Sequence, residues 1–223
     1  MPLQFPPAPD DGLIVVDKHL EANERRRRPV ISTDSSFAPY TPSMGQPRPT
    51  IKASDSSYAP HPVYVLNIDD LLPGGSGLLA ARALGYYYVL QNKKEKPCAR
   101  AHLLTDEFGQ SRIASLSFGT YSKDAVSSLK KLAISDRVLT GSYEVRSLRC
   151  KPILFSGIWL KALDGGFDLI CPLEKKYYLI NGDPPYPADD IIAALGPIAK
   201  IFLMKYQAFG NKRRADGPSN FAP

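Results

Sequence analysis

The 223-residue chain is poor in the side chains that build metal sites and disulfide frameworks. Its three cysteines, Cys98, Cys150 and Cys171, are an odd number, and no CxxC or CxxH pair occurs. The three histidines are scattered along the chain. A zinc site and a disulfide framework are therefore not expected, and we interpret the cysteines as reduced thiols in small apolar spaces. We expect neither a metal nor a cofactor.

Long apolar runs are also missing. The longest ones, 191–195 and 201–204, fall far short of the roughly 20 residues that a transmembrane helix needs. The first residues, Met1–Pro7, have neither the basic region nor the apolar core of a secretory signal peptide. These features predict an intracellular, cytoplasmic protein without a membrane partner.

The motifs of common enzyme classes do not occur in this sequence. The glycine-rich stretch 73–77 lacks the GK[ST] of a P-loop, and there is no strand-GxGxxG-helix unit, GxSxG elbow or HExxH pair. Three pairs of acidic residues are Asp69-Asp70, Asp106-Glu107 and Asp189-Asp190. Acids that are neighbours in sequence suit turns and helix starts better than a two-metal nuclease site. We therefore expect a protein that is not an enzyme.

Proline, in contrast, is abundant near the N-terminus. Eleven of the 21 prolines fall within residues 1–62, together with many Ser, Thr and Asp residues. Proline removes backbone donors, and the few apolar groups cannot offset the entropy lost on ordering, so residues 1–62 are predicted to form a disordered arm. Within this arm Leu13–Val16 is β-prone and Asp17–Arg28 has helical composition. We interpret the two together as a segment that orders on a partner.

A short pattern, [ST]-D-S-S-[FY]-A-P-[YH], occurs twice in the arm, at residues 33–40 and 54–61. Each copy places an aromatic residue beside a proline, which is typical of linear binding motifs, and a tethered second copy raises the effective concentration. Chance similarity within a low-complexity segment is the alternative. The residues expected to contact a protein partner are Phe37, Pro39, Tyr40, Tyr58 and Pro60.

The net charge of +6 belongs to the part of the chain after the arm. Residues 1–60 hold seven Lys/Arg and seven Asp/Glu, so residues 61–223 hold the other 21 of 28 bases and 15 of 22 acids. A basic folded region favours an acidic partner such as nucleic acid, although modest positive charge also serves solubility. The run Arg25–Arg28 has the same two interpretations, phosphate binding or a solvated stretch.

From Val63 onward, short β-prone runs are followed by an amphipathic helix, and this order occurs twice. The first set of runs is Val63–Ile68, Tyr86–Gln91, Cys98–Thr105 and Arg112–Phe118, and the second is Ser142–Leu148, Ile153–Leu160, Phe167–Cys171 and Tyr177–Ile180. The helical stripes are Tyr121, Ala125, Leu129 and Leu132, then Ile191, Leu195, Ile198, Phe202 and Tyr206. Gly196-Pro197 is expected to kink or divide the second helix, and Gly210 to end it.

We therefore predict an α+β fold with two β-β-β-β-α-like halves, in which antiparallel sheets are backed by helices. The halves cover residues 63–134 and 138–208, and residues 209–223 form a basic, flexible tail. In element order, residues 63–208 resemble the Whirly and PUR families, whose sheets bind single-stranded DNA or RNA. The resemblance includes no residue motif, so no site residue of either family is carried over.

Function is predicted from the face of the sheet that a backing helix leaves free. Nucleic-acid bases stack on aromatic rings there, while Arg and Lys contact phosphates. Core packing is the alternative for each of these aromatic residues. The candidate nucleic-acid-binding residues are Tyr86, Tyr88, Arg100, Arg112, Arg146, Arg149, Trp159, Lys161, Lys212, Arg213 and Arg214.

Two hypotheses of function follow. The first is sequence-tolerant binding of single-stranded nucleic acid through a basic, aromatic sheet face, with DNA and RNA not distinguished. The second is a structural or adaptor protein, of viral origin or from a multi-subunit assembly, that docks protein partners through its folded body and its tandem arm motifs. Self-assembly into a homo-oligomer belongs to the second hypothesis.

Overall fold

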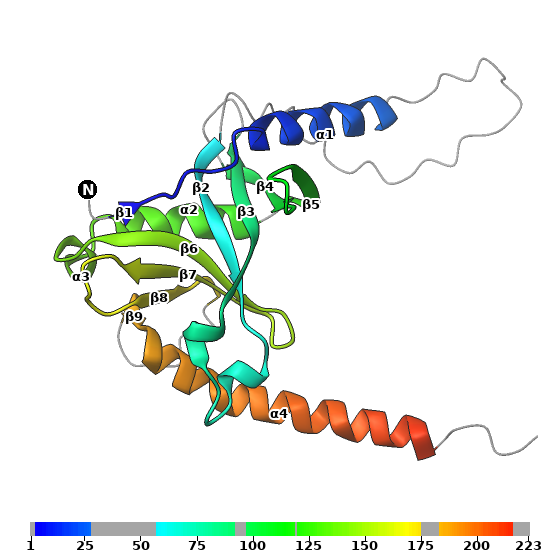
Figure 1. The fold of residues 1–223 in the computed structure, drawn as a ribbon, viewed down its shortest axis with the longest axis vertical. Coiled ribbons are helices and arrows are strands. Elements are labelled where there is room, and N and C mark those ends of the chain that lie inside the picture. Colours follow the sequence, from blue (N-terminus) through cyan, green and yellow to red (C-terminus); the bar gives the residue numbers. More distant parts are fainter. Residues whose placement is uncertain (1–2, 28–56, 92–96, 119, 175–182, 216–223) are drawn as a thin grey trace, which may run out of the picture. The chain divides into compact units, whose positions relative to one another are not determined.

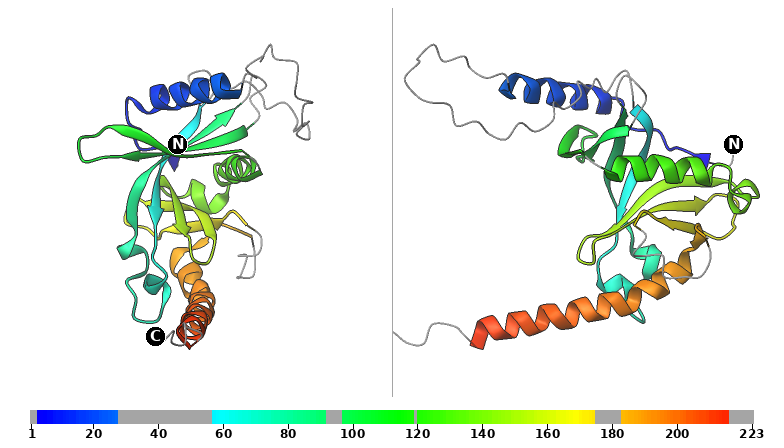
Figure 2. Two further views of the ribbon diagram at one scale, coloured as in Figure 1. Left: turned by 90° about the vertical axis from the view of Figure 1, so that its right-hand side faces the viewer. Right: turned by 180° about the vertical axis from the view of Figure 1, so that it is seen from behind.

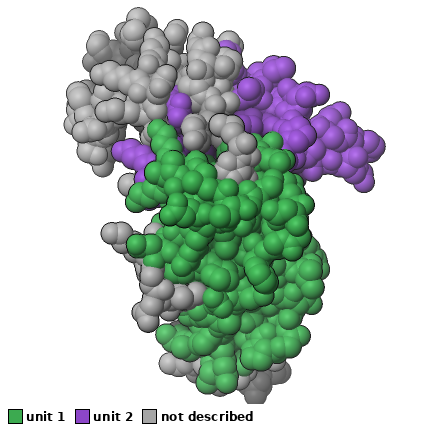
Figure 3. Space-filling model, turned by 90° about the vertical axis from the view of Figure 1, so that its left-hand side faces the viewer, with its two compact units in different colours: residues 1–5, 62–84, 128–223 green, residues 6–61, 85–127 purple. Residues whose placement is uncertain are grey.

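The computed structural model describes residues 3–27, 57–91, 97–118, 120–174 and 183–215. The chain divides into two compact units, which Figure 3 shows in different colours. Unit 1 contains residues 1–5, 62–84 and 128–223, and unit 2 contains residues 6–61 and 85–127.

Nine strands in the described residues form a mixed sheet with the order β5-β4-β3-β2-β6-β7-β8-β9, and β1 pairs with β6 (Figure 1). The strands are β1 (Leu3–Gln4), β2 (Ser57–Val65), β3 (Arg82–Gln91), β4 (Pro97–Thr105), β5 (Ser111–Phe118), β6 (Tyr143–Cys150), β7 (Phe155–Ala162), β8 (Leu169–Pro172) and β9 (Tyr186–Pro187). The helices are α1 (Gly12–Arg27), α2 (Thr120–Leu132), α3 (Asp136–Leu139) and α4 (Ala188–Ala215), with two 3-10 turns, η1 (Asp69–Leu71) and η2 (Gly77–Ala80).

Unit 2 is built on the antiparallel strands β3, β4 and β5. Alternation along β3 places Tyr88 and Leu90 on one face, where they form a core with Leu103 of β4. Helix α1 closes this core with Val16 and Leu20, which are four positions apart and both buried. A spacing of four puts two side chains on one side of a helix, so both can be buried together.

Helix α1 differs from the sequence-based prediction. Leu13–Val16, predicted as β-prone, lie in the first turns of α1, because burying Val16 and Leu20 on one helical face outweighs the weak preference of β-branched residues for strands. The disordered N-terminal arm is not confirmed. Its residues 3–27 include β1 and α1, residues 57–62 belong to β2, and residues 28–56 lie outside the described residues.

Unit 1 has its core between one face of the sheet and helix α4 (Figure 2). Strands β6, β7 and β8 are antiparallel neighbours, and Leu148, Phe155 and Trp159 point into this core. Ile191 and Leu195 of α4 pack against them, both with no exposed surface. Their spacing of four, continued by Ala199, defines the core side of α4.

The α+β prediction is confirmed, and several finer predictions are corrected. The sheet is mixed instead of antiparallel, because β1 and β2 both pair with β6 in parallel. The Whirly and PUR outline is not confirmed, and the predicted strand Tyr177–Ile180 lies outside the described residues. Each described set of strands is still followed by a helix, first α2 and then α4.

Helix α4 is longer than predicted. It continues through Pro197 and Gly210 to Ala215 as one element. The sequence predicted a kink or a division at Gly196-Pro197 and an end at Gly210, and neither the division nor the end occurs. Proline leaves the carbonyl four residues earlier without its helical donor. Pro197 and Ala193 are both on the exposed side of α4, so water can satisfy that carbonyl.

Replacing Leu195 with alanine tests the core of unit 1. Leu195→Ala removes a fully buried side chain and leaves a cavity, so the free energy of unfolding should fall by about 2–5 kcal/mol. The measurement is denaturant unfolding followed by the fluorescence of Trp159, the single tryptophan of the chain, which lies in the same core. Ile201→Ala, in the same helix but 54% exposed, is the matched control and should change it by less than about 1 kcal/mol. Equal effects of the two substitutions would contradict the described core.

Candidate docking surface

The predicted binding residues of unit 1 are held in contacts among themselves. The guanidinium of Arg146 lies over two rings, with its Cζ 4.6 Å from the ring centroid of Tyr64 and 4.7 Å from that of Trp159. Its Nε donates to Glu144 Oε1 at 2.6 Å. Cation–π contacts and an ion pair thus use both the cation and the ring faces that a nucleic acid would need.

Trp159 is also fixed from its other end. Its indole Nε1 donates to Asp168 Oδ2 at 2.9 Å, and the ring is only 4% exposed. Asp168 accepts from the backbone N of Ala162 at 3.0 Å and pairs with Lys161 Nζ at 3.3 Å. Asp168 therefore closes the loop between β7 and β8, and Trp159 is a core residue.

In unit 2 the predicted residues lie on two different faces of the sheet. The register pairs Tyr86 with Leu103 and Tyr88 with Ala101, so both tyrosines share the face that α1 covers. Arg100 pairs with Val89, which puts it on the opposite face, with its Cζ 4.4 Å from the ring centroid of Tyr87. The two tyrosines and Arg100 therefore cannot form one surface.

The side chain of Tyr88 is buried against the start of α1. It is 1% exposed, and its hydroxyl donates to the carbonyl of Pro9 at 3.4 Å. A Cβ on Gly12 would collide with the Tyr88 ring, so glycine is required there. Burial, with the nearby Asp11 carboxylate, raises the pKa of Tyr88 to about 12.

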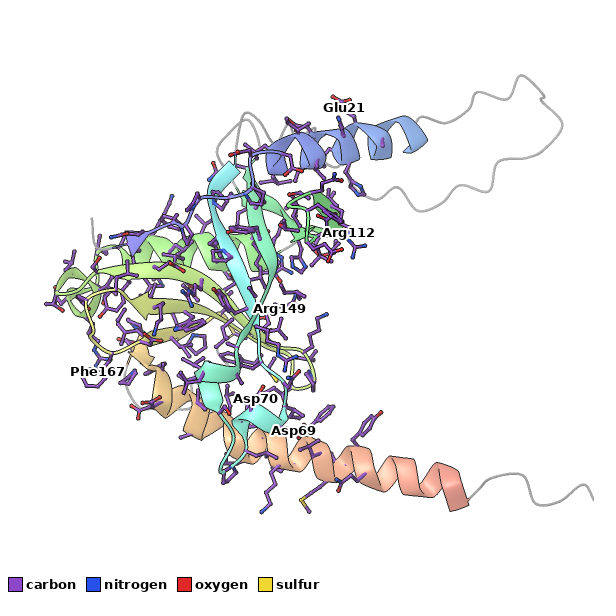
Figure 4. The ribbon with its side chains drawn as sticks, in the orientation of Figure 1. Glu21, Asp69, Asp70, Arg112, Arg149 and Phe167 are labelled. Atoms are coloured by element: carbon purple, nitrogen blue, oxygen red, sulfur yellow. The ribbon has the colours of Figure 1, made fainter. Side chains whose placement is uncertain are left out.

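The other predicted residues are dispersed or not described. Arg112 is exposed on β5, and Arg149 lies on the face of β6 opposite Arg146 (Figure 4). Pro60 is half-buried within β2, which also contains Tyr58. The remaining predicted residues, Phe37, Pro39 and Tyr40, lie outside the described residues, as do the side chains of Lys212, Arg213 and Arg214, although α4 includes those three positions.

The side of α4 that turns away from the core forms one wall of an apolar groove in unit 1. The groove has a volume of about 680 Å³. Its second wall is the end of η1 and the turn that follows it, and a Cβ on Gly196 would lie 3.0 Å from the carbonyl oxygen of Leu71, the last residue of η1. The lining residues are Leu71, Leu72, Pro73, Asp189, Ile192, Ala193, Gly196, Pro197 and Lys200. We call this the α4 groove.

A second hollow of about 520 Å³ adjoins the α4 groove, since Asp189 and Ile192 line both. Two large apolar side chains at its rim face water almost completely: Leu79 of η2 is 96% exposed and Phe167 is 84% exposed. Phe167 lies beside the start of α4 in Figure 4. The hollowed surface therefore extends from the β7–β8 loop, over the start of α4, and along that helix.

The C-terminal half of helix α4 extends past the other elements of unit 1 (Figures 1 and 2), although Phe202 and Leu203 still pack against the core. Ile201, Met204 and Tyr206 are 54%, 61% and 71% exposed. Met204 follows Lys200 by four positions, so it continues the groove side of the helix. The sequence predicted Tyr206 in the buried stripe of this helix, and its exposure shows that this prediction was wrong.

Sequence reasoning missed this surface, although one signal was present. The run 201–204 consists of four consecutive large apolar residues, which point to all sides of a helix. A single buried stripe uses only one of these sides. The turn at 71–73 carried no comparable signal, because its role depends on a tertiary approach to Gly196.

Two of the acidic pairs contain an aspartate that accepts hydrogen bonds from nearby backbone groups. Asp70 Oδ2 accepts from the backbone N of Asn67, and Asp106 Oδ1 accepts from the backbone N of Phe108 and of Gln110. Such bonds close turns.

No group of three or more His, Cys, Asp or Glu suited to a metal ion occurs in the described part of the chain. Within that part there is also no helix with the length and apolar character of a membrane span.

Comparisons of the chain with models of protein families, with curated proteins and with solved structures find no match.

The buried thiols give a pH-dependent prediction. Burial raises the pKa of both Cys150 and Cys171 to about 11, so at pH 8 the thiolate is about 0.1% of each. In a Cys98→Ser variant, a thiol reagent at pH 8 should modify neither residue in the folded chain, and both after unfolding. Labelling should rise only as the pH approaches 11. Rapid modification of the folded chain at pH 8 would contradict the described burial.

Proposed function

We propose that this protein is a non-enzymatic structural or adaptor protein that docks a protein partner on unit 1. The docking surface is the α4 groove together with the adjoining hollow and Met204. The observation that carries the proposal is the exposure of large apolar side chains at both ends of this surface, Leu79 and Phe167 at one end and Met204 at the other. Single exposed apolar residues are ordinary, whereas a hollow flanked by several exposed apolar side chains is typical of a binding site.

The energetics favour a partner that covers this surface. Removing a large apolar side chain from water stabilises a complex by about 1.5–3 kcal/mol when burial is complete. A few such residues in a groove are enough to supply most of the affinity of a protein interface. The polar groups at the rim, Asp189 and Lys200, are both exposed and can orient the partner by charge.

Binding of single-stranded nucleic acid is the second candidate function. The observation that favours it is the charge of α4 after Asp190, where five bases occur up to Ala215 and no acid. Phosphate contacts from these bases require no aromatic platform, so this candidate does not depend on Trp159 or Tyr88. It receives less support because both of those rings are buried.

Photo-crosslinking distinguishes the two functions. A photoreactive phenylalanine analogue is placed at Met204 of the full chain, which is then irradiated in cells. Docking of protein predicts discrete protein adducts that survive nuclease treatment, because the side chain at position 204 would lie within the interface. The substitution Ile192→Ser in the groove should reduce the adduct yield at least fivefold.

The matched control is the same analogue at Ile134, which is 76% exposed but does not line the groove. It should give no adduct that depends on Ile192. Adducts at 204 that disappear with nuclease would favour the nucleic-acid function. The absence of any adduct specific to position 204 would reject the docking proposal.

A further inference from the structure

We infer that the partner on the α4 surface is a second copy of this chain, with the two α4 helices antiparallel. The inference rests on the proposed docking function and identifies its occupant. Its first basis is the charge along α4. Asp189 and Asp190 begin the helix, whereas Lys200, Lys205 and the three bases at 212–214 follow. An antiparallel pair brings the acidic start of one helix to the basic half of the other, and a parallel pair would bring like charges together.

The second basis is the order of side chains on the groove side of α4. A two-fold axis passing between Ala194 and Leu195 would place Asp189 opposite Lys200 of the second copy. It would also place Ile192 opposite Pro197. All six α4 residues that line the groove are paired in this way, and the third pair is Ala193 with Gly196.

The two outer pairs are chemically complementary, because an acid meets a base and an apolar side chain meets an apolar ring. At the centre, Gly196 is buried against the carbonyl of Leu71 in its own chain, so the contact between the copies rests on the outer pairs. A two-fold interface repeats each pair, because the same patch of both copies takes part.

The third basis is the exposed apolar residues outside the groove. In the same arrangement Met204 of one copy lies opposite position 185 of the other, just before that copy's α4 begins. The adjoining hollow, with Leu79 and Phe167, lies at this end of the helix. The extended half of each α4 therefore covers the apolar rim of the other copy. From Asp189 to Met204 the helices would be in contact over roughly 23 Å.

Charge reversal tests this arrangement with the full chain in sedimentation and light-scattering measurements. The wild-type chain should dimerise with a dissociation constant in the micromolar range. Asp189→Lys alone and Lys200→Asp alone should each weaken dimerisation at least tenfold, because each creates two like-charge pairs. Both positions are exposed, so neither change disturbs the core, and the fluorescence of Trp159 verifies folding.

Rescue makes the test specific. The double variant Asp189→Lys/Lys200→Asp should return to within threefold of the wild-type dissociation constant, and so should an equimolar mixture of the two single variants. Lys151→Asp, an exposed reversal outside the groove, should have no effect. Failure of both rescues would overturn the antiparallel arrangement.

The outcome also separates this inference from the proposed function. A wild-type chain that is monomeric at about 100 µM would overturn the second-copy inference. If nuclease-resistant adducts at position 204 still formed with other proteins, the docking function would stand without it. If no such adducts formed, the docking function itself would be rejected.

Discussion

Burial of one side of α4 against strands β6, β7 and β8 is the constraint on which the rest of unit 1 depends. Ile191, Leu195 and Ala199 have no exposed surface, and together they fix the rotation of the helix about its own axis. Because a helix has 3.6 residues per turn, this rotation decides which residues face away from the core. Those residues form the wall of the α4 groove, so the groove is a direct consequence of the core.

The same rotation explains the character of the surface. The groove side of α4 has small residues at its centre, Ala193 and Gly196, and charged residues at its ends, Asp189 and Lys200. Glycine at position 196 leaves room for the carbonyl of Leu71, at the end of η1, which lies close to it. A larger residue there would displace that turn and with it the second wall of the groove. Core packing and surface shape in this part of the molecule therefore depend on the same few positions.

Much of the fold could be predicted from periodicity. The register agrees with period 2 within each strand, since Tyr86 and Tyr88 share one face of β3, and Arg100 and His102 share one face of β4. Period 2 reveals which residues share a face within one strand. It does not reveal which face a distant helix covers, or which faces of neighbouring strands coincide.

This is why the site was predicted less well than the fold. In unit 2 the face with Tyr88 is covered by α1, a helix from the segment that its proline content assigned to a disordered arm. In unit 1 the ring of Trp159 is buried in the core that α4 closes, and Asp168, nine residues later, accepts a hydrogen bond from its indole. Neither contact has a local sequence signal. The run of apolar residues at 201–204 did have one, but it was considered only as too short for a membrane span, and Phe202 alone was assigned to the buried stripe.

The central claim, that two copies dock through antiparallel α4 helices, is tested most directly by a distance between copies. A single spin label at Gln207, in a Cys98→Ser background where only the buried Cys150 and Cys171 remain, reports that distance by pulsed electron resonance. Helical rise and the usual spacing of packed helices predict about 40 Å between the two labels for the antiparallel pair. A separation near 10 Å would show a parallel pair. The absence of any distance between copies at concentrations where the chain should dimerise would contradict the account.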